Sequence, residues 1–211
     1  MTTQKRYKPV IVLDVGKVLV DINPTVVLKE LSRRYGRQIS LPASLDLDKL
    51  FSPIYVGACS WGDILKELNR ALGFSLEPGE WEGLWCQILR GEVPGMREAL
   101  AELKGEFRLV ALSNTEEVHW TYVLRNYPIF KLLDGWVVSY REGVAKPDPV
   151  IYQTLVDRYC NGRLPFFYID DILRNIEAAR HLGWDAEVFS DAAQFREEIE
   201  KRRAKYLKNP M

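Results

Sequence analysis

Polar side chains follow short apolar runs at four places in this sequence. They are a carboxylate, a serine with its two neighbours, a lysine and a pair of carboxylates: Asp14, Ser113 to Thr115, Lys146, Asp170 and Asp171. In an open α/β sheet, ligands bind beyond the carboxyl ends of the strands. If the apolar runs belong to one parallel sheet, these side chains therefore meet at one edge of it.

Each of these residues has an ordinary explanation when it is taken alone. An aspartate or serine after a strand is commonly a turn residue or a helix N-cap, and a lysine is commonly solvated. Three converging aspartates, however, raise each other's pKa unless positive charge lies between them. A lysine and Mg²⁺, which prefers carboxylate, water and phosphate oxygens, supply that charge. The set thus indicates phosphoryl transfer, with an aspartate attacking phosphorus and the cations neutralising the transferring group.

The elements that position these residues are predicted from apolar patterning. Continuous runs rich in β-branched residues are typical of buried parallel strands, and five are expected, over residues 9–13, 107–112, 135–139, 164–169 and 186–189. Helical spacing of apolar residues predicts helices over 95–104, 116–126, 148–160 and 174–183. This alternation predicts an α/β fold, a Rossmann-like parallel sheet core with helices on both faces.

One interval interrupts the alternation of strands and helices. Residues 22–91 contain no convincing strand, and helices are expected over 23–36, 60–73 and 78–91. We therefore expect an α/β core formed by residues 1–20 and 92–211, and a helical cap formed by residues 21–91 over the sheet's carboxyl edge. Inserts at this edge usually shape a site, although the insert could instead be structural decoration.

The composition of the chain limits the kinds of partner that the protein is expected to bind. The chain has 29 lysines and arginines against 29 aspartates and glutamates, so it lacks the basic excess typical of nucleic-acid binding. It has no apolar run of about 18 residues, the length of a membrane span. Three widely spaced cysteines form neither a disulfide framework nor a CxxC pair, which favours a reducing cytoplasm. The expected partner is a small-molecule phosphate ester, with no nucleic acid, no membrane and no obligate protein partner implied.

Four motifs in order carry a family resemblance. They are "LDVGKVLVD" (13–21), "LSNT" (112–115), "AKPDPVIY" (145–152) and "YIDDILRNIEAAR" (168–180), each at or just after a predicted strand. Over about residues 9–190 the chain resembles the haloacid dehalogenase superfamily of phosphohydrolases, with a small helical cap of the C1 type. The first motif is most similar to that of the DxGxVLxD branch, which includes glucose-1-phosphatase-like enzymes. The resemblance implies a Mg²⁺-dependent phosphatase for small phosphorylated metabolites of the sugar-phosphate type.

The resemblance also implies roles for individual residues. Asp14 would be the nucleophile and a Mg²⁺ ligand, and Gly16 would offer its backbone carbonyl to the metal and lie at the phosphate site. Ser113, with the Asn114 backbone, would hold phosphoryl oxygens, and Lys146 would bridge nucleophile and phosphoryl group. Asp171 would bind the metal directly, Asp170 would support it directly or through water, and Asn175 would contact this pair from behind. Lys17 is a further candidate for phosphate binding, or else a solvated loop lysine.

Gly16 is a departure from the family pattern. Most phosphatases of this superfamily carry a second aspartate at this position, which protonates the leaving oxygen and later activates water. Such acid–base help is commonly worth about 10²–10⁴ in rate. One alternative is that the substrates have better leaving groups, such as sugar 1-phosphates or aryl phosphates. Another is that a group such as Lys17 or Asp21 substitutes, and a third is that the protein is a catalytically weak or inactive phosphometabolite-binding protein. A 2-haloacid dehalogenase is disfavoured, because those relatives typically lack the paired aspartates.

The expected cap is rich in aromatic residues. These could stack on a sugar or another ring of the substrate, but aromatic residues at helical spacing more often pack in a core. His119 could approach the site from beyond the second motif, although an ordinary core or surface histidine is favoured. The aromatic residues concerned are Phe51, Tyr55, Trp61, Phe74, Trp81 and Trp85.

Overall fold

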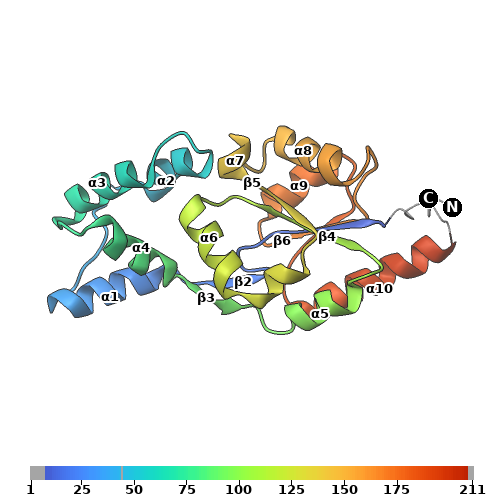
Figure 1. Cartoon of the computed structure of the whole chain (residues 1–211), viewed down its shortest axis with the longest axis horizontal. Helices are drawn as coiled ribbons and strands as arrows, with labels where there is room; N and C mark the ends of the chain where they lie inside the picture. The colour runs from blue at the N-terminus through green and yellow to red at the C-terminus, as the bar shows by residue number, and fades with distance from the viewer. Residues whose placement is uncertain (1–7, 44, 209–211) are drawn as a thin grey trace.

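A five-stranded parallel sheet lies at the centre of the protein (Figure 1). The computed structural model describes residues 8–43 and 45–208. Its strands are ordered β5-β4-β1-β6-β7, with bounds Val10–Leu13 for β1, Arg108–Ser113 for β4, Gly135–Val138 for β5, Phe167–Asp170 for β6 and Ala186–Val188 for β7. The predicted α/β fold is confirmed. Because β1 lies between β4 and β6, the three strands that precede Asp14, Asn114 and Asp171 are neighbours.

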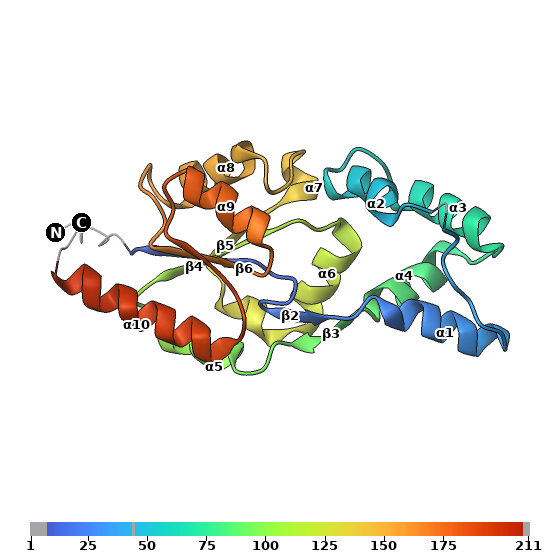
Figure 2. The same ribbon diagram turned by 180° about the vertical axis from the view of Figure 1, so that it is seen from behind.

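Helices cover both faces of the sheet, as Figures 1 and 2 show. The alternation of side chains along β1 sends Ile11 and Leu13 to one face and Val10 and Val12 to the other. The first face packs against α5 (Met96–Leu103), α6 (Glu117–Asn126) and α10 (Ala192–Lys208). The second packs against α8 (Pro149–Tyr159) and α9 (Leu173–His181). Two apolar layers thus hold β1, and with it Asp14, in a fixed position.

The segment after the first strand is mostly helical and lies beyond the carboxyl ends of the strands (Figure 1). It contains α1 (Thr25–Tyr35), α2 (Leu47–Tyr55), α3 (Trp61–Leu72) and α4 (Pro78–Cys86). Two short helices, η1 (Pro128–Leu132) and α7 (Ser139–Glu142), complete the helical elements of the described residues. Within residues 8–43 and 45–208, we find no helix of the length and apolarity that a membrane crossing requires.

The expectation that residues 22–91 contain no strand is wrong at both ends. Strand β2 (Val20–Ile22) pairs antiparallel with β3 (Leu89–Glu92), and beyond the pair Asn23 N donates to Ile88 O at 2.8 Å. Strands this short show no periodicity, and β3 reads "LRGE", which contains two charged residues and a glycine that disfavour strands. The helix predicted to reach residue 91 accordingly ends at Cys86.

Helix α2 is a second element that the sequence does not reveal. Pro53 lies within it, and proline normally ends a helix. The helix forms because the Asp46 side chain accepts from the Lys49 N–H at 3.0 Å, and because Phe51 and Ile54 are buried against the other helices. Tertiary packing here outweighs the local signal.

Candidate active site

Asp14 stands at the carboxyl end of β1, where a tight loop begins. Its own N–H donates to Ile169 O at 2.9 Å, which extends the pairing of β1 with β6. The N–H groups of Leu19 and Val20 then both donate to Val15 O at 2.9 Å. Lys17 takes the left-handed conformation, with φ 57°, which is uncommon for a residue other than glycine. The loop is therefore closed on itself and fixes the backbone on both sides of the Asp14 carboxylate.

Lys146 joins this carboxylate to the one on β6. Its Nζ donates to Asp14 Oδ1 at 2.7 Å, to Asp170 Oδ2 at 2.6 Å and to Leu112 O at 2.8 Å. These are the three hydrogen bonds that an ammonium group can donate. Burial alone would lower the pKa of Lys146, but the two carboxylates outweigh burial and raise it, so the side chain stays charged.

The two carboxylates that share Lys146 differ in their surroundings. Burial raises the pKa of Asp14 to about 7, and the neighbouring Asp170 adds to the rise, whereas Lys146 opposes it. Asp170 is also buried, but it accepts hydrogen bonds from Lys146, Tyr168 and the Ile172 N–H, and these lower its pKa overall. Asp14 is thus the carboxylate whose ionisation is poised near neutrality, and a cation beside it favours the ionised form.

A third carboxylate completes an acidic cluster. Asp14, Asp170 and Asp171 each offer an oxygen, and these oxygens lie within 4.8 Å of one another. Burial and the proximity of Asp170 raise the pKa of Asp171, while Lys17, whose Nζ lies 3.5 Å from the carboxylate, lowers it. When all three carboxylates are ionised, three negative charges face two lysines here. This imbalance and the oxygen ligands fit one hard divalent cation.

The two asparagines predicted at the site both form hydrogen bonds to other residues of the site. The Asn114 amide donates to Lys146 O at 2.8 Å and accepts from Lys146 N at 2.7 Å. Asn175 donates to the two oxygens of Asp170 at 3.0 and 3.1 Å. Asn114 therefore orients the backbone that carries Lys146, and Asn175 holds the Asp170 carboxylate.

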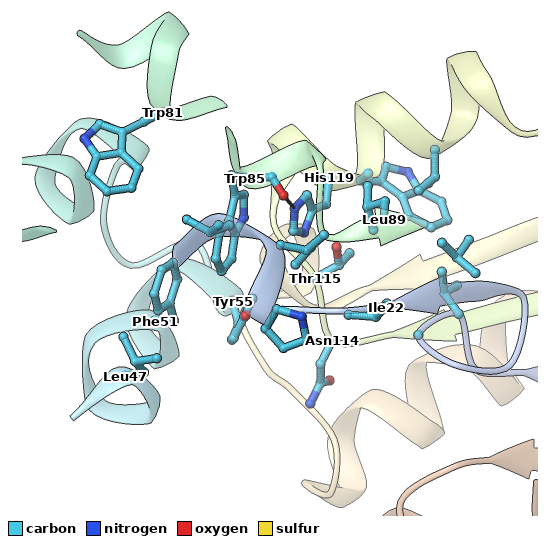
Figure 3. Close-up of a pocket in the computed structure, with 18 of the residues that line it drawn as sticks. Ile22, Leu47, Phe51, Tyr55, Trp81, Trp85, Leu89, Asn114, Thr115 and His119 are labelled. Carbon is cyan, nitrogen blue, oxygen red and sulfur yellow. Dashed lines mark hydrogen bonds between the residues drawn. The ribbon is translucent and has the colours of Figure 1, made fainter. Parts of the chain in front are cut away.

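A cavity of about 510 Å³ opens from this edge of the sheet (Figure 3). Gly16, Ser113, Asn114 and Thr115 line it from the sheet side, and side chains of the α1–α4 segment, of α6 and of the β2–β3 pair line much of the remainder. Gly16 meets Ile22 here, since a Cβ added to the glycine would lie 2.9 Å from Ile22 Cδ1. The space that a larger residue at position 16 would enter is therefore filled by an apolar side chain.

The aromatic residues of the expected cap divide into two groups. Phe51, Tyr55, Trp81 and Trp85 line the cavity. Phe74 instead stacks on Tyr35 at 4.5 Å between ring centroids, and Trp61 packs against Phe51 and Trp85. The packing interpretation therefore holds for Phe74 and Trp61, and it holds also for Phe51 and Trp81, which belong to the core. Stacking on a substrate stays a prediction for the residues that line the cavity.

His119 links the α1–α4 segment to the sheet domain. It is buried, its Nδ1 lies 3.2 Å from Glu116 Oε1, and its Nε2 lies 3.1 Å from Trp85 O (Figure 3). Trp85 Nε1 also donates to Glu116 Oε1 at 3.2 Å. Burial lowers the pKa of His119 to about 4 and raises the pKa of Glu116. The imidazole is therefore neutral near pH 7, and because a carbonyl oxygen accepts, its Nε2–H donates to Trp85 O.

Three further residues, which hold other residues of the site or the cavity wall in place, are not found by reading the sequence. They are Tyr168, whose hydroxyl donates to Asp170, Glu116, and Ser139, whose hydroxyl accepts from Thr115 N at 3.0 Å. Tyr168 precedes Asp170 by two residues on one strand, and such residues lie on the same face, so strand alternation could have indicated it. Glu116 and Ser139 give no comparable signal, because their partners come from other elements.

Comparisons with known proteins agree with this fold. Residues 9–183 match the family model described as haloacid dehalogenase-like hydrolase. A HAD family enzyme from Bacteroides thetaiotaomicron, in complex with magnesium and inorganic phosphate, superposes with TM-score 0.70 and 19% identity over 88% of this chain and 96% of its own. A predicted HAD-like family hydrolase from Porphyromonas gingivalis gives 0.73 and 21% over 93% and 98%.

An L-2-haloacid dehalogenase is also structurally similar, with TM-score 0.61 and 21% identity over 88% of this chain and 86% of its own. At such identities the likeness concerns the fold alone. The shared fold therefore serves more than one reaction, and the choice between them depends on the side chains of the site.

Proposed function

Because the chain belongs to the haloacid dehalogenase-like hydrolase family, we propose that this hydrolase is a Mg²⁺-dependent phosphatase acting on a small phosphate monoester. The observation that carries the proposal is the set of charges at one sheet edge. Lys146 lies between the carboxylates of Asp14 and Asp170, and Asp171 completes the cluster. A reaction at carbon has no need of a third carboxylate there, whereas transfer of a dianionic phosphoryl group needs a metal and a lysine.

In the proposed reaction, Asp14 is the nucleophile. The loop beyond β1 and the Lys146 hydrogen bond hold its carboxylate in one orientation, which is what a positioned nucleophile requires. One Asp14 oxygen attacks phosphorus, the ester oxygen leaves, and an aspartyl-phosphate forms. Ser113, the Asn114 backbone and Lys17 would hold the phosphoryl oxygens. Water then releases phosphate and restores the carboxylate.

The metal would be held by Asp14, Asp171 and the Gly16 carbonyl. Mg²⁺ bound there would neutralise charge on the phosphoryl group and favour the ionised form of Asp14. Asp170 has both oxygens engaged, with Ile172 N and Asn175 on Oδ1 and with Lys146, Tyr168 and Asn175 on Oδ2. We therefore assign Asp170 to a supporting role through water, and Asn175 to holding Asp170.

The proposal includes a division of the chain. Residues 1–20 and 92–211 would form the catalytic core, and residues 21–91 would form a cap that selects the substrate. Its support is the position of α1–α4 beyond the strand ends (Figure 1) and their contribution to the cavity.

A phosphometabolite-binding protein without turnover is the second candidate. It is motivated by Gly16, where the family's usual acid is absent, and by Ile22, whose side chain fills the adjoining space. This candidate predicts that phosphate esters bind tightly in the presence of Mg²⁺ and are recovered unchanged.

Turnover of p-nitrophenyl phosphate by Asp14→Asn tests the assignment of the nucleophile. With MgCl₂ present, the wild type should release nitrophenol, and both Asp14→Asn and added chelator should abolish the release. Asp157→Asn is a matched control, because Asp157 is exposed on α8 and does not belong to the acidic cluster. Retained turnover in Asp14→Asn would refute the mechanism, and wild-type binding without turnover would favour the second candidate.

A further inference from the structure

We propose that the organic group of the substrate is an apolar aromatic ring, so that the protein hydrolyses aryl phosphates in preference to sugar phosphates. This inference rests on the proposed phosphatase function and adds the class of substrate. It departs from the sugar-phosphate chemistry of the branch that the first motif resembles. Three features of the cavity carry it: its connection to the reacting group, the chemistry of its walls, and the occupant of the space beside Gly16.

The cavity and the proposed phosphoryl site share residues. Gly16 and Ser113 belong to the loops that would hold the metal and the phosphoryl oxygens, and both also line the cavity. A phosphate ester whose phosphorus lies next to Asp14 would therefore extend its organic group into the cavity. Its volume of about 510 Å³ is within the range for small-molecule sites, about 300–1,000 Å³.

The walls of the cavity offer few free polar groups. Among the described residues that line it, none is aspartate, glutamate, lysine or arginine. The Asn114 amide is bonded to the Lys146 backbone, both His119 nitrogens face Glu116 and Trp85, and the Thr25 hydroxyl donates to Asn23. A sugar would bring several hydroxyls into these surroundings. Each hydroxyl left without a partner is penalised, so a sugar is a poor occupant.

One wall is a stack of parallel rings. Phe51 lies on Trp85 with 4.6 Å between ring centroids and 5° between planes. Trp85 lies on His119 at 5.0 Å and 7° (Figure 3). Offset stacking of this kind is favourable between aromatic rings. Figure 3 shows Trp85 between Phe51 and His119, so the three rings together form an apolar wall. An aromatic group of the substrate fits such a surface better than a puckered, hydroxylated ring.

The occupied space beside Gly16 also favours an aryl phosphate as the substrate. Ile22 fills the position that an acid at residue 16 would occupy, so the leaving oxygen must depart with little help from a proton donor there. A phenol, with a pKa of about 10 as in tyrosine, is a much stronger acid than an alcohol. When Asp14 attacks phosphorus, the P–O bond breaks with its electron pair on the phenol oxygen, which takes a proton from water. A second water then hydrolyses the aspartyl-phosphate to free phosphate.

A substrate panel tests the inference on the wild-type protein. With MgCl₂, kcat/KM for 1-naphthyl phosphate should exceed that for glucose 1-phosphate by at least about 100-fold, since an apolar pocket discriminates against a single added hydroxyl by about 10² and glucose carries several. Equal or faster hydrolysis of glucose 1-phosphate would overturn the inference while leaving the phosphatase proposal intact. Failure to hydrolyse either ester would overturn the phosphatase proposal.

A binding measurement tests the cavity assignment independently of the chemistry of the leaving group. Calorimetry with 1-naphthylmethylphosphonate and methylphosphonate, both non-hydrolysable, should show at least about tenfold tighter binding of the naphthyl compound, because apolar surface is buried. The same preference without turnover would support the cavity assignment even if the phosphatase proposal fails. Equal affinities would overturn the cavity assignment.

Phe51→Leu and Phe74→Leu form a matched pair of variants. Phe51 stacks within the cavity wall, whereas Phe74 stacks on Tyr35 and does not line the cavity. Phe51→Leu should weaken naphthylmethylphosphonate binding by about 2- to 12-fold, the range for one aromatic pair, and Phe74→Leu should not. Equal effects in both variants would contradict the assignment of this wall.

A second pair guards against misfolding of Phe51→Leu. Leu47 lines the cavity and is 36% exposed, and Leu182, 38% exposed, lies at the end of α9 and does not line it. Leu47→Gln should weaken binding of the naphthyl compound, whereas Leu182→Gln should leave it unchanged. No difference between these two variants would count against the proposal.

Discussion

Replacing Gly16 by alanine should destabilise the protein, and shortening Ile22 by one methyl group should reverse that effect. The added Cβ would lie 2.9 Å from Ile22 Cδ1, whereas carbon atoms in contact are normally about 3.5–4.0 Å apart. Ile22 must therefore move by roughly 0.5–1 Å to meet that spacing. Overpacking of this kind costs about 1–3 kcal/mol. Because the end of an isoleucine side chain can move easily, we expect a cost near the lower value.

The sign of the Gly16→Ala effect should reverse in an Ile22→Val background. The valine lacks Cδ1, and the backbone at residue 16 is not in the left-handed region, so alanine meets no obstacle. Alanine then stabilises by about 0.4–1 kcal/mol, because it restricts the unfolded chain. The coupling energy in the double-mutant cycle should therefore be about 1–2 kcal/mol.

Urea unfolding of the four proteins at one pH, without added metal, measures this coupling. Ile22→Val alone should cost about 0.5–1 kcal/mol, with the m-value unchanged. Additivity of the two substitutions within about 0.3 kcal/mol would refute the reasoning, because Ile22 would then not occupy the space beside Gly16.

The same background allows the missing acid to be restored. Gly16→Asp combined with Ile22→Val should raise kcat on alkyl phosphates toward the gain of about 10²–10⁴ typical of acid–base catalysis. Aryl phosphates should gain less than about tenfold, since their leaving groups need little protonation. Gly16→Asn with Ile22→Val is the control of equal size without an acid, and an equal gain in this control would exclude proton donation as its cause.

Three further predictions concern charge and packing. Lys146→Met should cost about 3–5 kcal/mol at pH 8, because two buried carboxylates lose their shared cation; urea melts should show a smaller cost at pH 5, where the carboxylates take up protons. In the metal-free protein, the pKa of Asp14 is raised from 3.8 to about 7, so the folded state holds a proton that the unfolded state loses, and stability from this group falls as the pH rises from about 4 to 7. MgCl₂, which competes with that proton, should therefore raise Tm more at pH 8 than at pH 5, and equal shifts would contradict the assignment of Asp14 as a ligand. Gly135→Ala should cost more than about 3 kcal/mol, because its Cβ would lie 2.2 Å from Tyr159 Cε1, whereas Gly83→Ala, which meets nothing within 4 Å in α4, should stabilise by about 0.5–1 kcal/mol in thermal or urea melts.

The sequence predicts the sheet and the edge where the site lies, because both follow from local patterns. The apolar run at residues 10–13 can only be buried, and the parallel topology then brings the ends of β1, β4 and β6 together. Lys146, 132 residues from Asp14 along the chain, is placed correctly at this edge because it follows another strand of the same sheet. The roles assigned to these residues stay predictions until the variants are measured.

The arrangement of the side chains around the cavity could not be predicted from the sequence, because it depends on how separate elements pack. Nothing near Ile22 in the sequence indicates that its Cδ1 lies beside Gly16. The bonds of Glu116 to Trp85 and His119 likewise join α4 to the start of α6. Short elements such as β2 and β3 also escape, because three or four residues carry too little pattern to be recognised.

The pairing of β2 with β3 has a consequence for how such a protein can diversify. The N–H of Asn23 donates to the Ile88 carbonyl at 2.8 Å, so the chain leaves the sheet region and returns to it at adjoining points. The residues between β2 and β3 can be treated as one long loop whose two ends are held together by this pairing. The entropy of closing such a loop changes by only about 0.6 kcal/mol for each doubling of its length. Mutation and insertion can therefore reshape the walls of the cavity over evolutionary time, while the sheet that carries Asp14 and Lys146 retains its stability.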